Sequence, residues 1–600
     1  MTISIFPDMS GHATTFESEG LKDLLDTVQS STPLLPGETW SGRILMVVPK
    51  RHGYLARTNC FQQRFIGCSD LGATKDRTVF GMGIKPVATD NIQGFLSDYL
   101  LIVVRTDRHG SHLCDEPTLI EEVDARLNFQ WRLEDEPKQR TLAIVDGHLN
   151  LKSYLPFFNS AAALGIKFVL LESATHWITD SSLRHLYHHF IPIDMTPNDT
   201  FHERIASAVK AYGSVDGICA IATYCLLPVA KAAAMLGLPT APPESVACAI
   251  DKYETRILAG GAEPTVLVGN VLELEGLMKT RGFVPQYPLI VKPGSGTGSA
   301  HVFRADTLVE LLEAVRRICQ GSNKKALIEA YIDGPELDVN FVLLDGEVLF
   351  FEIADDFPSP GDDGTIDSDF WENTNVLPSI LPTEEYKVVR ETLHELLLNM
   401  GLKTGVFHLE ARVQNSAMTY GEEAGVIDLR PESTRAGENK KSPRCFLIEV
   451  NPRPPGMPCI LSTAASYGVN MYDLHLLASL ADHKRYRALS KPFDFEKLIP
   501  NHARAWSQLV WLRADKSGIC SSDDVCNEFL QQLSPRDRAL ITESMCFFQR
   551  GQRIPELKQG VVLFGAFFVV TSRTNRHDVL RVAGALQKKF SIPVEEELGY

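Results

Sequence analysis

The sequence predicts an α/β protein in which a Rossmann-like parallel α/β domain precedes a domain of mixed α+β structure. Apolar runs alternate with helix-length segments as far as about residue 245, a pattern typical of strands buried on both faces of a parallel sheet. Beyond that point the pattern changes to glycine-rich turns and strands of alternating polarity. The chain has 600 residues, 44% apolar and 22% charged, which is an ordinary globular composition with enough length for several hydrophobic cores.

The charge balance and the cysteines exclude several classes of protein. With 59 basic and 75 acidic residues the net charge is −16, so we expect no nucleic acid partner. The 12 cysteines include no C-x-x-C pair, which argues against zinc ribbons and redox motifs and favours reduced thiols in the cytoplasm. The start of the chain lacks the features of a secretory signal, and the apolar stretch at 217–236 is interrupted by Pro228 and Lys231, so we expect no membrane span.

The first 246 residues divide into two predicted parts. Residues 1–135 form a partly α/β N-terminal region to which the sequence assigns no chemistry, and residues 136–246 form the Rossmann-like domain. The clearest unit of this domain is a strand at 142–145, a helix at 153–164 that stops at Gly165, and a strand at 167–171. The other strands expected in the two parts lie at 43–48, 99–104, 190–193 and 217–222.

Residues 247–482 and 483–600 form the two remaining predicted domains. Prolines at 239, 242 and 243 mark the exit from the parallel domain, and a helix at 244–260 leads into the next one. The last domain is predicted to be α+β, with a strand at 561–571 and a helix at 578–590. Its expected role is to pack against the domain before it.

A glycine-rich loop follows a predicted strand that ends in Lys292. The loop contains Gly294, Ser295, Gly296, Thr297, Gly298 and Ser299. Glycines let backbone N–H groups approach phosphate oxygens closely, and a lysine at the strand end adds positive charge, so the segment is a candidate phosphate site. Neither the Walker A pattern nor the dinucleotide-binding fingerprint fits its spacing. Taken alone, the segment could equally be a plain hairpin loop with a solvated lysine.

A second polar segment follows at 327–336. An apolar strand carries Glu329, Ala330 and Ile332, and the chain turns at Gly-Pro before Glu336. Such a strand can offer backbone groups and two carboxylates to a polar heterocycle and its sugar.

Two strands of alternating polarity carry a candidate metal site. Glu410 projects from one of them, and Glu449, Asn451 and Arg453 project together from the other. Paired side by side, the strands would set Glu410, Glu449 and Asn451 around one point, and three oxygen donors suit Mg²⁺ bound to nucleotide phosphates and water. A surface ion pair between Glu449 and Arg453 is the alternative.

Taken together, these motifs from 247 to 481 resemble the ATP-grasp family. The matching stretches are D-K at Lys252, V-K-P-x-x-G-x-G-S at Lys292, E-A-Y-I-D-G-P-E from Glu329 to Glu336, F-H-L-E at Glu410, and E-V-N-P-R-P from Glu449. The loop variant and the last motif are most similar to the carnosine synthase and L-amino-acid ligase branch.

The resemblance implies a role for each matching residue. Lys252 and Lys292 would contact the phosphates of ATP, with 294–299 as a mobile lid. Glu329, Ala330 and Ile332 would hold the adenine, and Glu336 the ribose. Glu410, Glu449 and Asn451 would bind Mg²⁺, or Mn²⁺ in its place, and Arg453 would stabilise the transferring phosphoryl group.

The expected activity is ATP-dependent joining of a small-molecule carboxylate to an amine, through an acyl phosphate, with release of ADP and Pi. Amino acids are the expected substrates, and a homodimer is a reasonable expectation from the resemblance. The alternatives are a ligase that joins an amino acid to another kind of metabolite, an ATP-grasp carboxylase or kinase, and a nucleotide-binding regulator without turnover.

Two stretches depart from the family pattern. Residues 352–372 contain eight acids and no basic residue, and we expect either a solvated loop or a loop that attracts a cationic amine. Residues 414–444 are longer than a short hairpin needs and are predicted to be a surface insertion.

Overall fold

The protein is described by a computed structural model of the chain. The structure describes residues 2–5, 41–46, 52–66, 80–81, 83–84, 102–107, 116–147, 150–260, 264–294, 296, 301–320, 324–363, 368, 370–371, 374–432, 441–495, 499, 502–556 and 563–595. It is an assembly of α/β parts in which both parallel and antiparallel sheets occur, as the sequence predicts. Among these residues, no helix has both the length and the apolar character needed to cross a bilayer.

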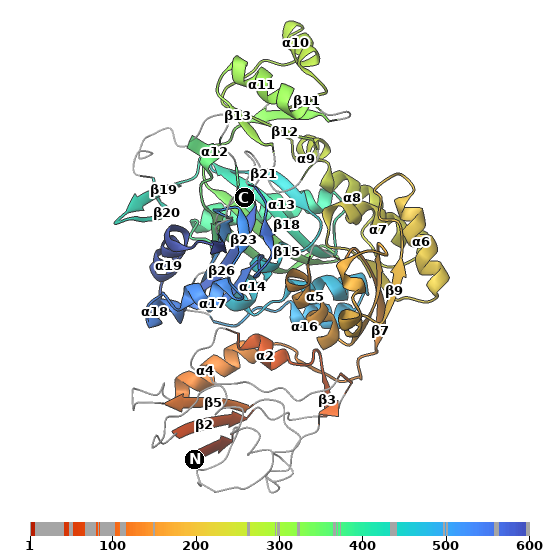
Figure 1. Ribbon diagram of the computed structural model, residues 1–600, viewed down its shortest axis with the longest axis vertical. Coiled ribbons are helices and arrows are strands. Elements are labelled where there is room, and N and C mark those ends of the chain that lie inside the picture. Colours follow the sequence, from red (N-terminus) through yellow and green to blue (C-terminus); the bar gives the residue numbers. More distant parts are fainter. Residues whose placement is uncertain are drawn as a thin grey trace.

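The N-terminal region contains two small sheets (bottom of Figure 1). One has the order β1-β2-β5 and the other β4-β3-β6. Strand β1 is parallel to β2, whereas β2 is antiparallel to β5, so this region is α/β only in part. Its elements are β1 (Thr2–Ile5), β2 (Ser41–Met46), β3 (Gly53–Leu55), α2 (Cys60–Arg64), β4 (Gly83–Ile84), β5 (Ile102–Asp107), α4 (Glu116–Leu127) and β6 (Arg132–Leu133).

A four-stranded parallel sheet of order β10-β7-β8-β9 follows, on the right in Figure 1. Leu142 and Ile144 of β7 face a core that includes α5, while Ala143 and Val145 face a core that includes α6 and α7. Both faces are therefore buried, which explains the continuous apolar runs of the sequence. The elements are β7 (Arg140–Val145), α5 (Leu151–Ala163), β8 (Ile166–Glu172), β9 (His189–Pro192), α6 (Phe201–Tyr212), β10 (Gly217–Cys219) and α7 (Thr223–Leu236), with short 3₁₀ turns at Trp177–Thr179 and Ser181–Leu186.

The expected single helix at 244–260 is two helices, α8 (Pro243–Ile250) and α9 (Lys252–Ala259). They meet at Asp251, whose extended backbone ends α8 and whose side chain accepts hydrogen bonds from the N–H groups of Tyr253 and Glu254. Asp251 therefore caps α9, and Lys252 becomes the first residue of that helix.

A second four-stranded sheet, of order β11-β14-β12-β13, forms the lobe at the top of Figure 1. We call it the small lobe. Helices α10 and α11 share one apolar core with its strands, including Phe283, Val291, Leu311 and Ile328. Its elements are β11 (Val266–Val268), α10 (Val271–Lys279), β12 (Leu289–Pro293), β13 (Phe303–Ala305), α11 (Leu308–Ile318) and β14 (Ala326–Ala330).

The largest sheet has eight strands in the order β21-β18-β15-β16-β17-β22-β26-β24. Strands from the C-terminal part of the chain continue the sheet of the preceding part, because β17 pairs with β22. The strands are β15 (Glu336–Leu344), β16 (Glu347–Asp356), β17 (Thr374–Leu377), β18 (Gly405–Gln414), β21 (Arg444–Asn451), β22 (Trp506–Arg513), β24 (Ile541–Cys546) and β26 (Phe564–Ser572).

The two faces of this sheet differ in polarity. On β15, Leu337, Val339 and Phe341 pack into a core with Val389 and Leu393 of α13 (Thr383–Asn399). The residues between them, Asp338 and Asn340, point to the opposite face. That polar face is partly covered by α14 (Met457–Tyr467), where Thr463 donates a hydrogen bond of 2.7 Å to Glu352.

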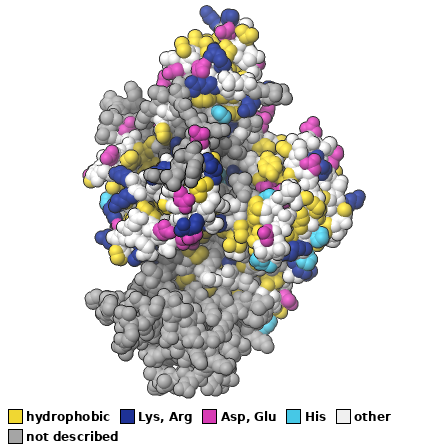
Figure 2. Space-filling model, in the orientation of Figure 1, with side chains coloured by type: hydrophobic (Ala, Val, Ile, Leu, Met, Phe, Trp, Pro, Cys, Tyr) yellow, Lys and Arg dark blue, Asp and Glu magenta, His cyan; other side chains and the backbone are white. Residues whose placement is uncertain are grey.

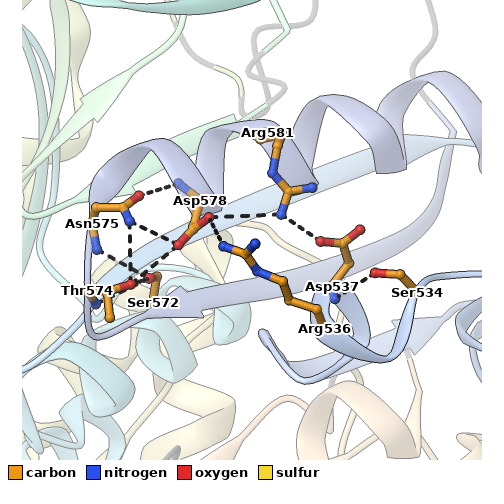
Figure 3. A network of polar contacts seen from close by, with 8 residues as sticks. All are labelled: Ser534, Arg536, Asp537, Ser572, Thr574, Asn575, Asp578 and Arg581. Atoms are coloured by element: carbon orange, nitrogen blue, oxygen red, sulfur yellow. Dashed lines mark hydrogen bonds and ion pairs between the residues drawn. The ribbon is translucent and has the colours of Figure 1, made fainter.

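The remaining elements surround the large sheet. They are α12 (Pro360–Asp363), β19 (Met418–Glu423), β20 (Val426–Pro431), α15 (Met471–Ser479), α16 (His483–Leu489), β23 (Gly518–Cys520), α17 (Val525–Leu530), α18 (Pro535–Arg538), β25 (Arg553–Ile554), α19 (Arg576–Lys589) and β27 (Val594–Glu595). A polar network fixes the start of α19, where Asn575 accepts from the N–H of Asp578 and Arg581 lies 2.6 Å from Asp537 of α18 (Figure 3).

The predicted insertion and the acidic stretch both contain regular secondary structure. The predicted insertion 414–444 contains the paired strands β19 and β20, and residues 433–440 lie outside the described part. The acidic stretch 352–372 is not a solvated loop throughout, because Glu352, Asp355 and Asp356 are buried on β16. Its residues 364–367, 369 and 372 lie outside the described part.

Over the described part of the face shown in Figure 2, acidic and basic side chains are interspersed. The net charge of −16 is therefore not gathered into one acidic area on that face.

Candidate functional site

A cavity of about 330 Å³ lies between the small lobe and the polar face of the large sheet. Ten of the residues singled out in the sequence line it together, although they come from five separate stretches of the chain. They are Lys252, Lys292, Glu329, Ala330, Ile332, Glu336, Glu410, Glu449, Asn451 and Arg453.

On the small-lobe wall, Lys292 and Glu329 form a buried ion pair. Their side chains lie on the neighbouring strands β12 and β14, with Nζ 2.6 Å from Oε1. Arg256 of α9 approaches the other carboxylate oxygen at 2.9 Å and lies over the ring of Phe446. Burial alone would raise the pKa of Glu329, but the two cations bring that pKa below its usual value. The ionised carboxylate of Glu329 therefore holds Lys292 in place, and its negative charge is balanced by Lys292 and Arg256.

The glycine-rich loop is described only in part. The N–H of Gly294 donates to the carbonyl of Lys325 at 3.0 Å, so this N–H is used within the small lobe. Gly296 is exposed, with a φ of 154°. The other predicted loop residues, Ser295, Thr297, Gly298 and Ser299, lie outside the described residues.

The connection from β14 to β15 is held by Arg412 of β18. This guanidinium donates to Glu336 at 2.8 Å and to the carbonyl of Ile332 at 3.1 Å. It also contacts the hydroxyl of Tyr331 and, at 2.7 Å, Asp362 of α12. Burial raises the pKa of Asp362, but Arg412 outweighs that effect and the pKa is lowered. Arg412 thus joins the connection, the sheet and α12 into one unit.

On the large-sheet wall, carboxylates from three adjacent strands meet. Glu410 stands directly opposite Glu449 on one side and Asp338 on the other. Burial, with a smaller contribution from Glu449, raises the pKa of Glu410 to about 8, and burial raises that of Asp338 to about 7. Lys252 is ion-paired with Glu449.

These groups fit a divalent cation, because a cation beside Glu410 and Glu449 would remove their mutual repulsion and make ionised Glu410 favourable. Within the described residues, no group of three or more acidic, His or Cys side chains is arranged to hold a metal. The predicted set of two carboxylates and one amide would leave the remaining positions to phosphate oxygens and water.

Asn451 and Arg453 lie at the end of β21, next to the parallel domain. Arg453 donates to the side-chain oxygen of Asn451 at 3.1 Å, to the carbonyl of Pro454 at 2.8 Å and to Thr223 of α7 at 3.3 Å. Glu449 is paired with Lys252 rather than Arg453, so the structure does not support the alternative of a surface ion pair between Glu449 and Arg453. Burial lowers the pKa of Arg453 from its usual value.

His408 also lines the cavity and lies two residues before Glu410 on the same face of β18. Burial, and then the charge of Arg453, lower its pKa to about 3, so the imidazole is neutral. One ring nitrogen lies 3.0 Å from the side-chain oxygen of Asn340, which fixes the ring.

Four aromatic residues complete the cavity, and sequence reasoning did not assign them to the site. They are Phe370, Trp371, Trp511 and Phe564. The last two belong to the C-terminal strands β22 and β26, for which only a packing role was expected. Both residues lie far from the motifs along the chain, so no sequence pattern indicated a role in the site. The pairing of β17 with β22 brings them to the cavity.

Two segments of the chain match models of protein families. A family model described as the ATP-grasp N-terminal domain matches residues 158–240, and one described as the ATP-grasp domain matches residues 285–425. The ATP-grasp enzyme fsqD of Aspergillus fumigatus is 35% identical over 477 residues, which cover 77% of this chain and 81% of that protein.

More distant relatives extend the comparison. Carnosine synthase 1 of Mus musculus is 25% identical over 380 residues, which cover 59% of this chain and 40% of that protein. The crystal structure of an L-amino acid ligase from Bacillus licheniformis has the same fold, with a TM-score of 0.57 at 19% identity, and the match covers 76% of this chain and 100% of that one.

Proposed function

The chain belongs to the ATP-grasp family of enzymes, and on this premise we propose that it is an ATP-dependent carboxylate–amine ligase that forms an amide or peptide bond. The observation that carries the proposal is one cavity that unites two lysines, the carboxylates Glu410 and Glu449, and Arg453. The names of two relatives, a carnosine synthase and an L-amino acid ligase, support amino acids as substrates.

The reaction needs a leaving group, because a carboxylate is a poor electrophile. A carboxylate oxygen of the acid attacks the γ-phosphorus of ATP, which forms an acyl phosphate and releases ADP. The amine nitrogen then attacks the acyl carbon, the C–O bond to phosphate breaks, and the amine gives up a proton. Phosphoryl transfer of this kind is catalysed mainly by positioning and by charge neutralisation.

The residues of the cavity divide these tasks. Lys292, held by Glu329, and Lys252, held by Glu449, would neutralise phosphate charge. Arg453 would stabilise the transferring phosphoryl group and the tetrahedral species that follows. Mg²⁺ bound by Glu410, Glu449 and Asn451 would supply Lewis-acid stabilisation of the phosphate oxygens.

Nucleotide recognition is assigned to the connection from β14 to β15. Ala330 and Ile332 would present backbone groups to the adenine, and Glu336 would accept from the ribose hydroxyls. Because Glu329 is already paired with Lys292 and Arg256, we assign it to holding Lys292 rather than to direct contact with the base.

We place the reaction in the cytoplasm. Seven of the ten cysteines among the described residues are buried, and the sequence contains no C-x-x-C pair, which suits a reducing compartment.

The proposal is tested by supplying purified protein with ATP, Mg²⁺ and pairs of acids and amines while ADP, AMP and Pi are measured together. ADP and Pi should form only when both an acid and an amine are present. Formation of AMP and pyrophosphate would instead show adenylation and would contradict the proposal. Calorimetry with Lys292→Ala should show a sharp loss of ATP affinity, and unchanged affinity would remove this lysine from the phosphate site.

A further inference from the structure

We propose that the end of the cavity formed by Phe370, Trp371, Trp511 and Phe564 binds an uncharged aromatic ring carried by the acid or the amine substrate. We call these four residues the aromatic wall. The inference rests on the proposed function, since it names the substrate class of the same site. The wall is built from three elements, namely the stretch before β17, strand β22 and strand β26.

The wall lies on the same face of the large sheet as the carboxylates. Asn375 of β17 donates to Asp338 at 2.8 Å, which places it on the polar face. Leu509 stands directly opposite Asn375, and Trp511 follows two residues later, so Trp511 points to that same face. Helix α14 connects the regions, because Ser462 contacts Ser507 of β22 at 2.6 Å and Cys459 lines the cavity with Trp511. This helix begins four residues after Arg453.

Three rings of the wall lie in contact, with Phe564 between Trp371 and Trp511. The centroids of Trp511 and Phe564 are 4.8 Å apart, and those of Trp371 and Phe564 are 5.6 Å apart. Trp371 is 5% exposed and anchors the wall, whereas Phe564 is 40% exposed. A large apolar side chain left open at an enzyme cavity is unfavourable in water and becomes favourable when another apolar or aromatic group covers it.

The charges at the cavity argue against a cationic side chain, rather than an uncharged ring, as the group bound at the wall. Each described acid that lines the cavity lies on the nucleotide or metal side, where Glu329, Glu336 and Glu449 are each paired with a cation. Two of the acids once expected to attract a cationic amine are occupied as well, because Asp355 is paired with Arg576 and Asp362 with Arg412. The described wall therefore offers ring faces and no acidic counter-ion, and the guanidinium of Arg513 lies 4.2 Å from the ring centroid of Trp371.

The test is calorimetric binding to the full chain in the presence of Mg²⁺ and a non-hydrolysable ATP analogue. L-phenylalanine should bind at least tenfold more tightly than L-alanine or L-lysine. 3-Phenylpropionate, which lacks the amine, and phenethylamine, which lacks the carboxylate, then show whether the ring belongs to the acid or to the amine. Tight binding of either one supports the proposal and assigns the ring to that substrate.

Substitutions test the wall itself. Phe564→Ala should weaken L-phenylalanine binding at least tenfold, and Phe564→Leu, which keeps apolar volume without the ring, should weaken it less. Affinity for the ATP analogue should change less than twofold. Leu272→Ala, which removes a 78% exposed side chain on α10 outside the cavity, is the matched control and should change neither affinity.

Several outcomes would overturn the inference. They are equal or tighter binding of L-alanine or L-lysine, no binding of any of the aromatic probes, and L-phenylalanine binding that Phe564→Ala leaves unchanged. The failure of the proposed function is distinguishable, because it would appear as absence of ADP and Pi with every acid–amine pair while selective binding of the aromatic probe persists.

Discussion

Each of the two walls of the cavity carries a carboxylate, and the pKa values of these two carboxylates are shifted in opposite directions. Glu329 on the small-lobe wall has its pKa lowered by Lys292 and Arg256 in spite of burial. Glu410 on the large-sheet wall has its pKa raised to about 8 by burial and by neighbouring Glu449. The first charge is balanced within the protein, whereas burial and Glu449 favour the protonated form of Glu410, so an ionised Glu410 would need a further cation beside it.

The largest effect should come from removing charge on the large-sheet wall. Glu449→Gln should lower ATP turnover on the order of 10³-fold, because it removes a proposed metal ligand and the partner of Lys252. Turnover is measured as ADP release, and circular dichroism should show an unchanged fold. Near-normal ADP release would mean that this wall does not depend on a cation.

Removing charge on the small-lobe wall should instead lower stability. Glu329→Gln leaves Lys292 and Arg256 buried without a counter-charge, which should cost about 3–5 kcal/mol. Thermal unfolding checks this, with Glu347→Gln as the control because that carboxylate is exposed and paired with Arg487 at the surface. If both variants unfolded at the same temperature, the ion pairs of Glu329 would contribute nothing to stability.

A third buried carboxylate extends the comparison beyond the cavity. Glu352 receives hydrogen bonds from Asn340 and Thr463, no cation among the described residues pairs with it, and burial raises its pKa to about 7. The native state therefore holds a proton that the unfolded state has lost, so stability is present at low pH and is lost as the pH rises through 7. Between pH 5.5 and 8.5 this carboxyl should reduce the free energy of unfolding by about 2 kcal/mol.

The check is thermal unfolding across that pH range for the wild type and for Glu352→Gln. The unfolding temperature of the variant should fall less with rising pH than that of the wild type. Identical pH profiles for the two proteins would show that Glu352 does not carry this proton.

The smallest effect on stability should come from removing an ion pair at the protein surface. Arg581 and Asp537 lie 2.6 Å apart beside α19 (Figure 3), and the Arg581 side chain is 37% exposed. Arg581→Ala should cost less than about 1 kcal/mol, because solvent screens exposed pairs. If Arg581→Ala lost as much stability as Glu329→Gln, burial would not explain why the two ion pairs contribute differently.

The sequence predicted the parts of the site that depend on local pattern. Alternation along a strand put Glu449, Asn451 and Arg453 on one face, and the pairing of β18 with β21 set Glu410 opposite Glu449 as expected. Strands β7 and β8 and the helix between them were also predicted, because their continuous apolar runs reflect burial on both faces of the sheet.

The remaining parts depend on contacts that no short segment encodes. Arg256 lies in a helix whose sequence gives no sign that it reaches Glu329, 73 residues away. The acidic stretch was expected at the surface because nothing nearby could neutralise it, yet Asp355 meets Arg576 from the far end of the chain. Trp511 and Phe564 reach the cavity only through sheet order, which the sequence does not reveal.

The unbroken eight-stranded sheet has a consequence for how such an enzyme can diverge. Strands β15, β18 and β21 at one end carry the groups proposed for nucleotide and metal, whereas β22 and β26 at the other carry the aromatic wall. Substitutions can accumulate on the wall without changing the strands that hold the phosphates. A single framework can thus retain one reaction through evolution while the compounds it accepts are replaced.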